Sequence, residues 1–252
     1  MLPIARCEPP ARTIAVREAA AVPERRAERV AARLLDRYLG AVARRARVAY
    51  ADENGRALAP ADVDAHVDAL IARPQPIVAT YWIDNALGVA LLPFVDTAFA
   101  RLLSTVTCVI DDTFAGRVAG RLIEGIAGRC ALLPLPGDPE RLAQVHGLMT
   151  RRSSCAFPVD GGGPYRQVGT GIVTLAASLR AAIVPLAAAV GPAVRSLHRS
   201  RVRIPLPRTR LGVVLGHPIA VGRDDDRRAL AIRLRTTLNE LDATARSIAR
   251  RA

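Results

Sequence analysis

The pattern of hydrophobic and polar positions predicts a helix at the start of the chain. Between Pro23 and about Tyr50, apolar residues recur at helical spacing and the opposite face carries arginines. The apolar positions are Val30, Leu34, Leu35, Tyr38 and Leu39, and the arginines are Arg25, Arg26, Arg29, Arg33, Arg37 and Arg44. This periodicity predicts a basic amphipathic helix. Two interpretations stay open: the helix packs on the domain with its arginines in solvent, or it docks on a membrane surface.

The next segment contains a candidate metal cluster. A turn-rich connector, "ADENGRALAP", leads into a short helix that begins at Asp62 and carries Asp64, His66 and Asp68. Side chains two positions apart on a helix point in different directions, so these three cannot close on one ion. We predict a solvated acidic face and no metal site.

From Pro76 onward, strand and helix patterns alternate. Strand patterns cover residues 76–82, 105–111, 130–135, 153–160, 182–190 and 210–221, and helical patterns cover 85–103, 113–127, 138–149, 170–180 and 223–251. This alternation predicts an α/β fold with a mixed or mostly parallel sheet flanked by helices. We expect residues 76–252 to form that domain and residues 1–75 to form an N-terminal extension of irregular lead-in and amphipathic helices.

Charge narrows the choice of partners. The chain of 252 residues has a net charge of +13, and all 36 of its basic residues are arginines. A basic surface suits phosphate head groups or nucleic acid. Aromatic residues make up only 4% of the chain and do not alternate with the arginines, and no zinc-finger, RRM or homeodomain spacing is present. We therefore expect no nucleic-acid partner and keep an anionic membrane surface as a candidate.

Cysteine usage and hydropathy bear on location. Cys7, Cys108, Cys130 and Cys155 form no CxxC pair. This indicates reduced thiols in a cytosolic protein and no structural zinc. The sequence has no run of about 18 apolar residues and no convincing signal peptide. We expect a cytoplasmic protein, peripheral to the inner face of the membrane if the arginine-rich helix docks there.

A glycine loop, "FPVDGGGPY", follows the strand pattern at 153–160. Ligands of open α/β sheets bind beyond the carboxyl ends of strands, where this loop lies. A Walker loop requires a lysine, which the chain lacks; a dinucleotide fingerprint fails at Thr174; and GxSxG is absent. The loop is then either a tight turn or a ligand-binding loop whose backbone N–H groups meet a phosphate or carboxylate, aided by the helix that begins near Thr170.

Two long segments carry a resemblance to a known family. They read "PVDGGGPYRQVGTGIVTLAASLRAAIVPLAAAV" and "SLHRSRVRIPLPRTRLGVVLGHPIAV". The matching positions are Asp160, Gly161, Pro164, Gly171, Leu175, Ala176, Pro185, Ser196, Ile204, Pro205, Leu206, Pro207, Gly216, Pro218 and Ile219. From Pro76 onward the chain resembles the lysophospholipid acyltransferase superfamily, in particular its DUF374-like group. The resemblance implies a glycerolipid acyltransferase-like fold, a donor such as acyl-CoA or acyl-carrier protein, and a lysophospholipid-like acceptor.

The catalytic positions of that family are changed. Trp82 is kept, but Ile83 stands where the family has its histidine, Ala115 replaces the aspartate, and the loop arginine is a glycine. Acyl transfer to a hydroxyl needs a base, and isoleucine cannot accept a proton. The resemblance therefore implies a degenerate acyltransferase-like protein that binds a lipid, an acyl chain or a partner and needs no cofactor. The implied ligand-binding residues are Trp82, Asp160, Gly161, Gly162, Gly163 and Pro164.

Two alternatives remain open. Asp84, next to Ile83, could serve as a relocated catalytic base in an active acyltransferase, because carboxylates that converge at strand ends can become usable bases. Alternatively, Asp84 and Asp112 cap the helices that follow them. A third class, an enzyme that uses carboxylates with a divalent cation, is weakened by the lack of His and Cys ligands. In the site we expect Asp160 to Pro164 to line the same cleft as Trp82 and Asp84.

Overall fold

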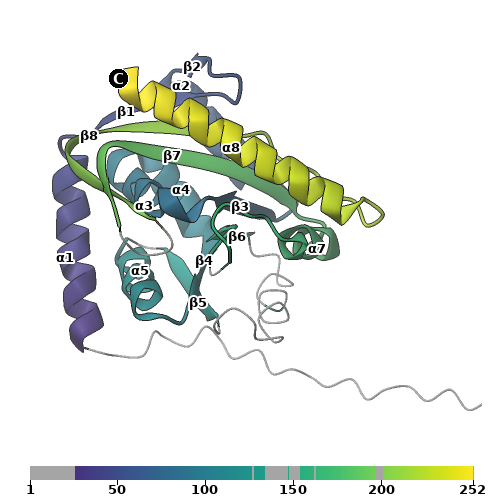
Figure 1. The fold of residues 1–252 in the computed structure, drawn as a ribbon, viewed down its shortest axis with the longest axis horizontal. Coiled ribbons are helices and arrows are strands. Elements are labelled where there is room, and N and C mark those ends of the chain that lie inside the picture. The colour runs from purple at the N-terminus through teal and green to yellow at the C-terminus, as the bar shows by residue number, and fades with distance from the viewer. Residues whose placement is uncertain are drawn as a thin grey trace, which may run out of the picture.

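The computed structural model describes residues 26–126, 128–133, 147, 154–161, 163–196 and 201–251. Within these residues the chain forms an eight-stranded sheet in the order β2-β1-β8-β7-β3-β6-β4-β5 (Figure 1). The strands are β1 (Arg47–Ala51), β2 (Ala57–Leu58), β3 (Ile77–Tyr81), β4 (Val106–Asp111), β5 (Arg129–Leu133), β6 (Ser154–Pro158), β7 (Ala182–Arg195) and β8 (Arg203–Leu215).

The sheet is mixed. Strands β7, β3, β6, β4 and β5 run parallel to one another, whereas β8 is antiparallel to β7 and β2 is antiparallel to β1. The helices are α1 (Arg26–Ala43), α2 (Pro60–Ile71), α3 (Ala86–Val95), α4 (Thr97–Thr105), α5 (Phe114–Gly125), α7 (Thr170–Leu179) and α8 (Arg227–Arg251), with a 3-10 turn η1 (Ile83–Asn85) after β3. The predicted α/β fold with a mixed sheet and flanking helices is confirmed.

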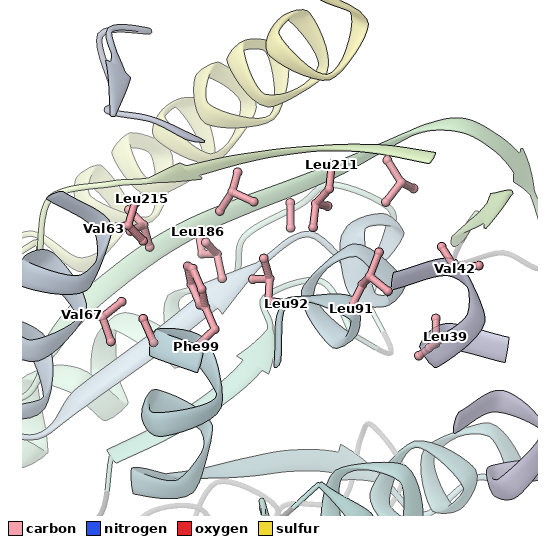
Figure 2. Packing of buried hydrophobic residues seen from close by; sticks show 14 of the residues in the cluster. Leu39, Val42, Val63, Val67, Leu91, Leu92, Phe99, Leu186, Leu211 and Leu215 are labelled. Atoms are coloured by element: carbon pink, nitrogen blue, oxygen red, sulfur yellow. The ribbon is translucent and has the colours of Figure 1, made fainter. Parts of the chain in front are cut away.

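Strand β7 is buried on both faces, which explains its unbroken apolar sequence. Because side chains alternate along a strand, Leu186 and Ala188 face the cluster formed with α1, α2, α3 and α4, shown from close by in Figure 2. Ala187 and Ala189 face the opposite way and pack against Leu241 and its neighbours on α8. The sheet is therefore covered by helices on both sides of its centre.

Two glycines permit the close approach of helices to the sheet. A Cβ atom on Gly88 of α3 would lie 2.0 Å from the carbonyl oxygen of Ala188 in β7. A Cβ atom on Gly212 of β8 would lie equally close, 2.0 Å, to the carbonyl oxygen of Ala245 in α8. No side chain fits at either position, so glycine sets the spacing of both helices.

The N-terminal helix differs in extent from the sequence expectation. It ends at Ala43, and the residues predicted to continue it form β1, which pairs in parallel with β8. The predicted apolar face is buried only in part: Leu39 is fully buried and Leu35 and Tyr38 pack against the core, whereas Val30 and Leu34 are 50% and 61% exposed. The buried positions are Glu28, Ala32, Leu39 and Val42. Glu28 accepts a hydrogen bond from Arg117 Nε of α5 at 2.7 Å, so the buried side of the helix includes an ion pair that the apolar pattern did not indicate.

The helix predicted over 85–103 is two helices. Asp96 separates α3 from α4 and caps α4 by accepting a hydrogen bond from Ala98 N at 2.8 Å. No single helix among the described residues is both long and apolar enough to cross a bilayer; segments Ile83–Val95 and Thr97–Thr105, bent by 111°, pass that test only when joined. The helix predicted over 138–149 lies outside the described residues, apart from Gly147.

Candidate functional site

The candidate site lies beyond the carboxyl ends of two adjacent strands. Strands β3 and β6 are parallel, with Tyr81 opposite Pro158 at their ends. The turn η1, which carries Asp84, follows β3, and the glycine loop follows β6. The topology thus brings together two segments that sequence reasoning treated as partners.

Asp84 is held by basic and hydroxyl groups. Its side chain is 1% exposed and accepts two hydrogen bonds from Arg166 Nη2, at 2.9 and 3.2 Å. Tyr165 donates its hydroxyl to the same carboxylate at 2.9 Å, and Arg203 Nη2 approaches it at 3.5 Å. The lone pairs of Asp84 are therefore engaged within the protein.

A second buried carboxylate comes from the last helix. Asp242 of α8 has no exposed surface, forms ion pairs with Arg166 and Arg246, and accepts a hydrogen bond from Asn85 Nδ2 at 3.2 Å. We call Asp84, Arg166, Arg203, Asp242 and Arg246 the Arg–Asp network. Its members join the segments after β3 and β6 to β8 and α8, and so fix the geometry of the site.

Asp160 has a positioning role. Its buried carboxylate accepts hydrogen bonds from the backbone N–H of Ile83 at 2.8 Å and of Arg166 at 2.9 Å. Burial raises the pKa of Asp160 above its ordinary value, and these backbone N–H groups act in the opposite direction. Asp160 thereby ties the glycine loop to the position that holds the histidine in the resembled family.

Trp82 and Asp84 do meet the glycine loop, but in a closed arrangement. Trp82 is 1% exposed, and the Arg166 guanidinium lies 5.7 Å from the centre of its ring. Trp82, Asp84 and Asp160 are all buried. The expected juxtaposition beyond the strand ends is present, whereas these three side chains face protein and not an open cleft.

Part of the glycine loop is engaged in its own turn. Gly161 N–H donates to the carbonyl of Pro158 at 3.2 Å, and Gly163 N–H donates to the carbonyl of Asp160 at 3.1 Å. Gly163 and Pro164 are exposed, and Gly162 lies outside the described residues. The two N–H groups that can be traced are already satisfied, which favours the tight-turn interpretation for them.

The expectation that Asp84 and Asp112 cap helices is wrong. Trp82 occupies the N-cap of η1 and Asn85 that of α3, whereas Asp84 is drawn into the Arg–Asp network. Helix α5 is capped by Thr113, which accepts from Gly116 N–H at 3.0 Å, and Asp112 instead binds Arg117.

Neither Ala115 nor the acidic residues of the candidate metal cluster take part in the candidate site. Ala115 lies exposed in the first turn of α5. Asp64 and Asp68 both bind Arg101 of α4, at 3.1 and 2.9 Å, and the described residues contain no group of three His, Cys, Asp or Glu side chains placed to hold a metal ion.

Sequence reasoning missed four members of the network. Arg166, Arg203, Asp242 and Arg246 were not singled out, although Asp242 lies among the buried apolar positions of α8, a pattern unusual for a carboxylate. No protein-family model, no curated protein and no solved structure matches the chain.

Proposed function

We propose that the protein is a non-catalytic, acyltransferase-like protein that binds lipid at a membrane surface. One observation carries the first half: the carboxylate nearest the family's catalytic position, Asp84, is buried in ion pairs. The second half is supported by the exposed arginines of α1.

The chemistry argues against acyl transfer at this site. A general base must come within about 2.6–3.2 Å of the hydroxyl it deprotonates, or act through one water. Asp84 is 1% exposed and already accepts from Arg166 and Tyr165. Asp160 is committed to two backbone N–H groups. Neither carboxylate has a free face to offer a substrate.

Acyl-CoA turnover tests this half of the proposal. Purified protein, mixed with acyl-CoA and lysophospholipid, should release no more free thiol than a buffer blank. The competing function, an active acyltransferase with a relocated base, requires turnover that disappears in Asp84→Asn. Turnover by the wild-type protein that is lost in a correctly folded Asp84→Asn variant would refute the non-catalytic proposal.

The lipid-binding half rests on the outer face of α1. Arg26, Arg33 and Arg37 are exposed beside Val30 and Leu34. Arginines that flank exposed apolar side chains suit an anionic bilayer, because the guanidinium groups reach phosphates while the apolar groups enter the interface. A cytoplasmic location at the inner face of the membrane is part of this proposal.

Vesicle cosedimentation tests the lipid-binding half. The protein should bind phosphatidylcholine vesicles that contain phosphatidylglycerol, should ignore pure phosphatidylcholine, and should be released by salt. The double variant Arg33→Gln/Arg37→Gln should lose about 30-fold in affinity, because each arginine contributes about 1 kcal/mol near an anionic surface.

The matched control removes the same charge elsewhere. Arg233→Gln/Arg235→Gln changes two exposed arginines of α8 and should leave vesicle binding nearly unchanged. Equal losses in both double variants would show that only net charge matters and would remove α1 as the docking face. Equal binding to neutral and anionic vesicles would do the same.

A further inference from the structure

A pocket lined by arginines lies apart from the buried site residues Trp82 and Asp160. It has a volume of about 560 Å³ and lies between the β7–β8 hairpin and the last turns of α8. Its lining includes Arg195, Arg203, Arg208, Arg210, Arg246 and Arg250, and no lining residue is acidic. We call it the arginine pocket. A cavity of this size falls within the roughly 300–1,000 Å³ typical of small-molecule sites.

The inner wall of the pocket is built and buried. Arg203 is only 6% exposed, and its Nη2 forms an ion pair with the carboxylate of Asp84 at 3.5 Å. Arg246 is anchored by Asp242. The Nε groups of Arg203 and Arg246 have no hydrogen-bond partner among the described residues. The buried Arg203 and the partly exposed Arg246 thus line the cavity, each with a buried Nε–H donor that lacks a partner among the described residues, and a buried donor left unpaired is costly.

In the described part of the chain, ion pairs engage two of the six arginines of the pocket. Arg203 pairs with Asp84 and Arg246 pairs with Asp242, and Arg166 shares both of these carboxylates. Burial, followed by repulsion from Arg203 and Arg166, lowers the pKa of Arg246 to about 10. An anion between the guanidinium groups would relieve that repulsion.

Irregular backbone positions of the β7–β8 hairpin line the pocket. The register of β7 and β8 shifts between Gly191 and Ala193, both of which line the pocket, and Arg208 adopts a φ of 63°. That left-handed conformation is uncommon for a residue with a side chain. Such departures from regular pairing re-aim side chains, and here they occur where the pocket is lined.

We propose that the arginine pocket binds a phosphorylated small molecule or head group through a phosphomonoester or diphosphate. Guanidinium groups bind phosphate oxygens in a bidentate manner, and several converging arginines favour a ligand with at least two negative charges. The site shares Arg203 and Arg246 with the Arg–Asp network, but the proposal depends neither on the α1 docking face nor on acyl transfer. Its ligand chemistry is shared by soluble phosphate esters and by phosphatidic acid, so the test separates these sources.

Isothermal titration with inorganic pyrophosphate tests the site directly. The double variant Arg195→Gln/Arg208→Gln removes two lining arginines that have no part in the Arg–Asp network. It should fold normally by circular dichroism and lose at least about tenfold in pyrophosphate affinity, since two charge-assisted contacts are removed. The control Arg233→Gln/Arg235→Gln, with the same net charge, should stay within about twofold of wild type.

Competition identifies the source of the phosphate. If pyrophosphate displaces the protein from phosphatidic acid vesicles and the pocket variant binds them weakly, the pocket takes a lipid head group. If pyrophosphate binds without displacing the protein, the pocket takes a soluble phosphate ester; both results support the proposal. Absence of pyrophosphate binding to the wild type, or an equal loss in the control variant, would overturn it.

Discussion

Replacing Asp242 by asparagine should be among the most destabilising single changes in the described fold. Asparagine keeps the size and shape of the side chain, so no cavity forms. What disappears is a fully buried negative charge that pairs with Arg166 and Arg246. Arg166 retains Asp84, whereas Arg246 loses its carboxylate partner in the network.

The expected loss follows from these surroundings. Removing one partner of a buried ion pair costs about 3–5 kcal/mol, because the other charge stays buried without compensation. Arg246 keeps 32% of its side chain exposed and Arg166 is still paired, so the lower end applies. A loss of about 3 kcal/mol is a large part of the roughly 5–15 kcal/mol that stabilises a typical domain.

Urea unfolding provides the assay. The single tryptophan, Trp82, is buried beneath Arg166, so its fluorescence reports on the network itself. The control is Asp64→Asn, which removes a carboxylate that is 50% exposed and should cost less than about 1 kcal/mol. If Asp242→Asn and Asp64→Asn lower the urea midpoint equally, the buried ion pairs of Asp242 do not stabilise the fold more than an exposed pair does.

Two further predictions concern packing and buried thiols. Gly88→Ala and Gly212→Ala should each cost about 1–3 kcal/mol in thermal or urea unfolding, because a methyl group would meet a backbone oxygen; Gly125→Ala, with nothing within 4 Å, should be neutral or stabilising, and an equal loss there would contradict the packing argument. Burial raises the pKa of Cys108 and of Cys155 to about 12. These thiols stay neutral in the fold while the unfolded chain ionises, so their contribution to stability is complete below pH 9 and is lost as pH rises toward 12. In the native protein Cys108 and Cys155 should react slowly with a thiol reagent at pH 8, as followed by peptide mapping; rapid native labelling of Cys155 would contradict its burial.

The strands were predictable where burial leaves a clear pattern. Strand β7 is covered on both faces, so its continuous apolar run could be recognised without knowing its partners. Strand β1 could not, because its arginine and half-buried residues continue the helical pattern of α1. The buried side of α1 was predicted only in part, because Glu28, a residue expected in solvent, is buried against Arg117.

The position of the candidate site could be predicted from the sequence, but most of the residues that form it could not. Strand ends and the glycine loop pointed to Asp84 and Asp160, which are both bound by Arg166. The arginines that neutralise Asp84 gave no signal, since the chain has 36 basic residues and Arg166 and Arg203 look like any of them. Asp242 did offer one, because it lies beside Leu238 and Leu241 on the buried side of α8.

The separation of the network's members along the chain affects when the native state is completed. Asp84 meets Arg166 across 82 residues, and Asn85 meets Asp242 across 157. Closing loops of that length carries an entropy cost that local strand–helix units avoid. The contacts of the Arg–Asp network should therefore form after the folding transition state. Weakening it would then accelerate unfolding and leave the folding rate nearly unchanged, so the lifetime of the native protein depends on contacts that contribute little to reaching it.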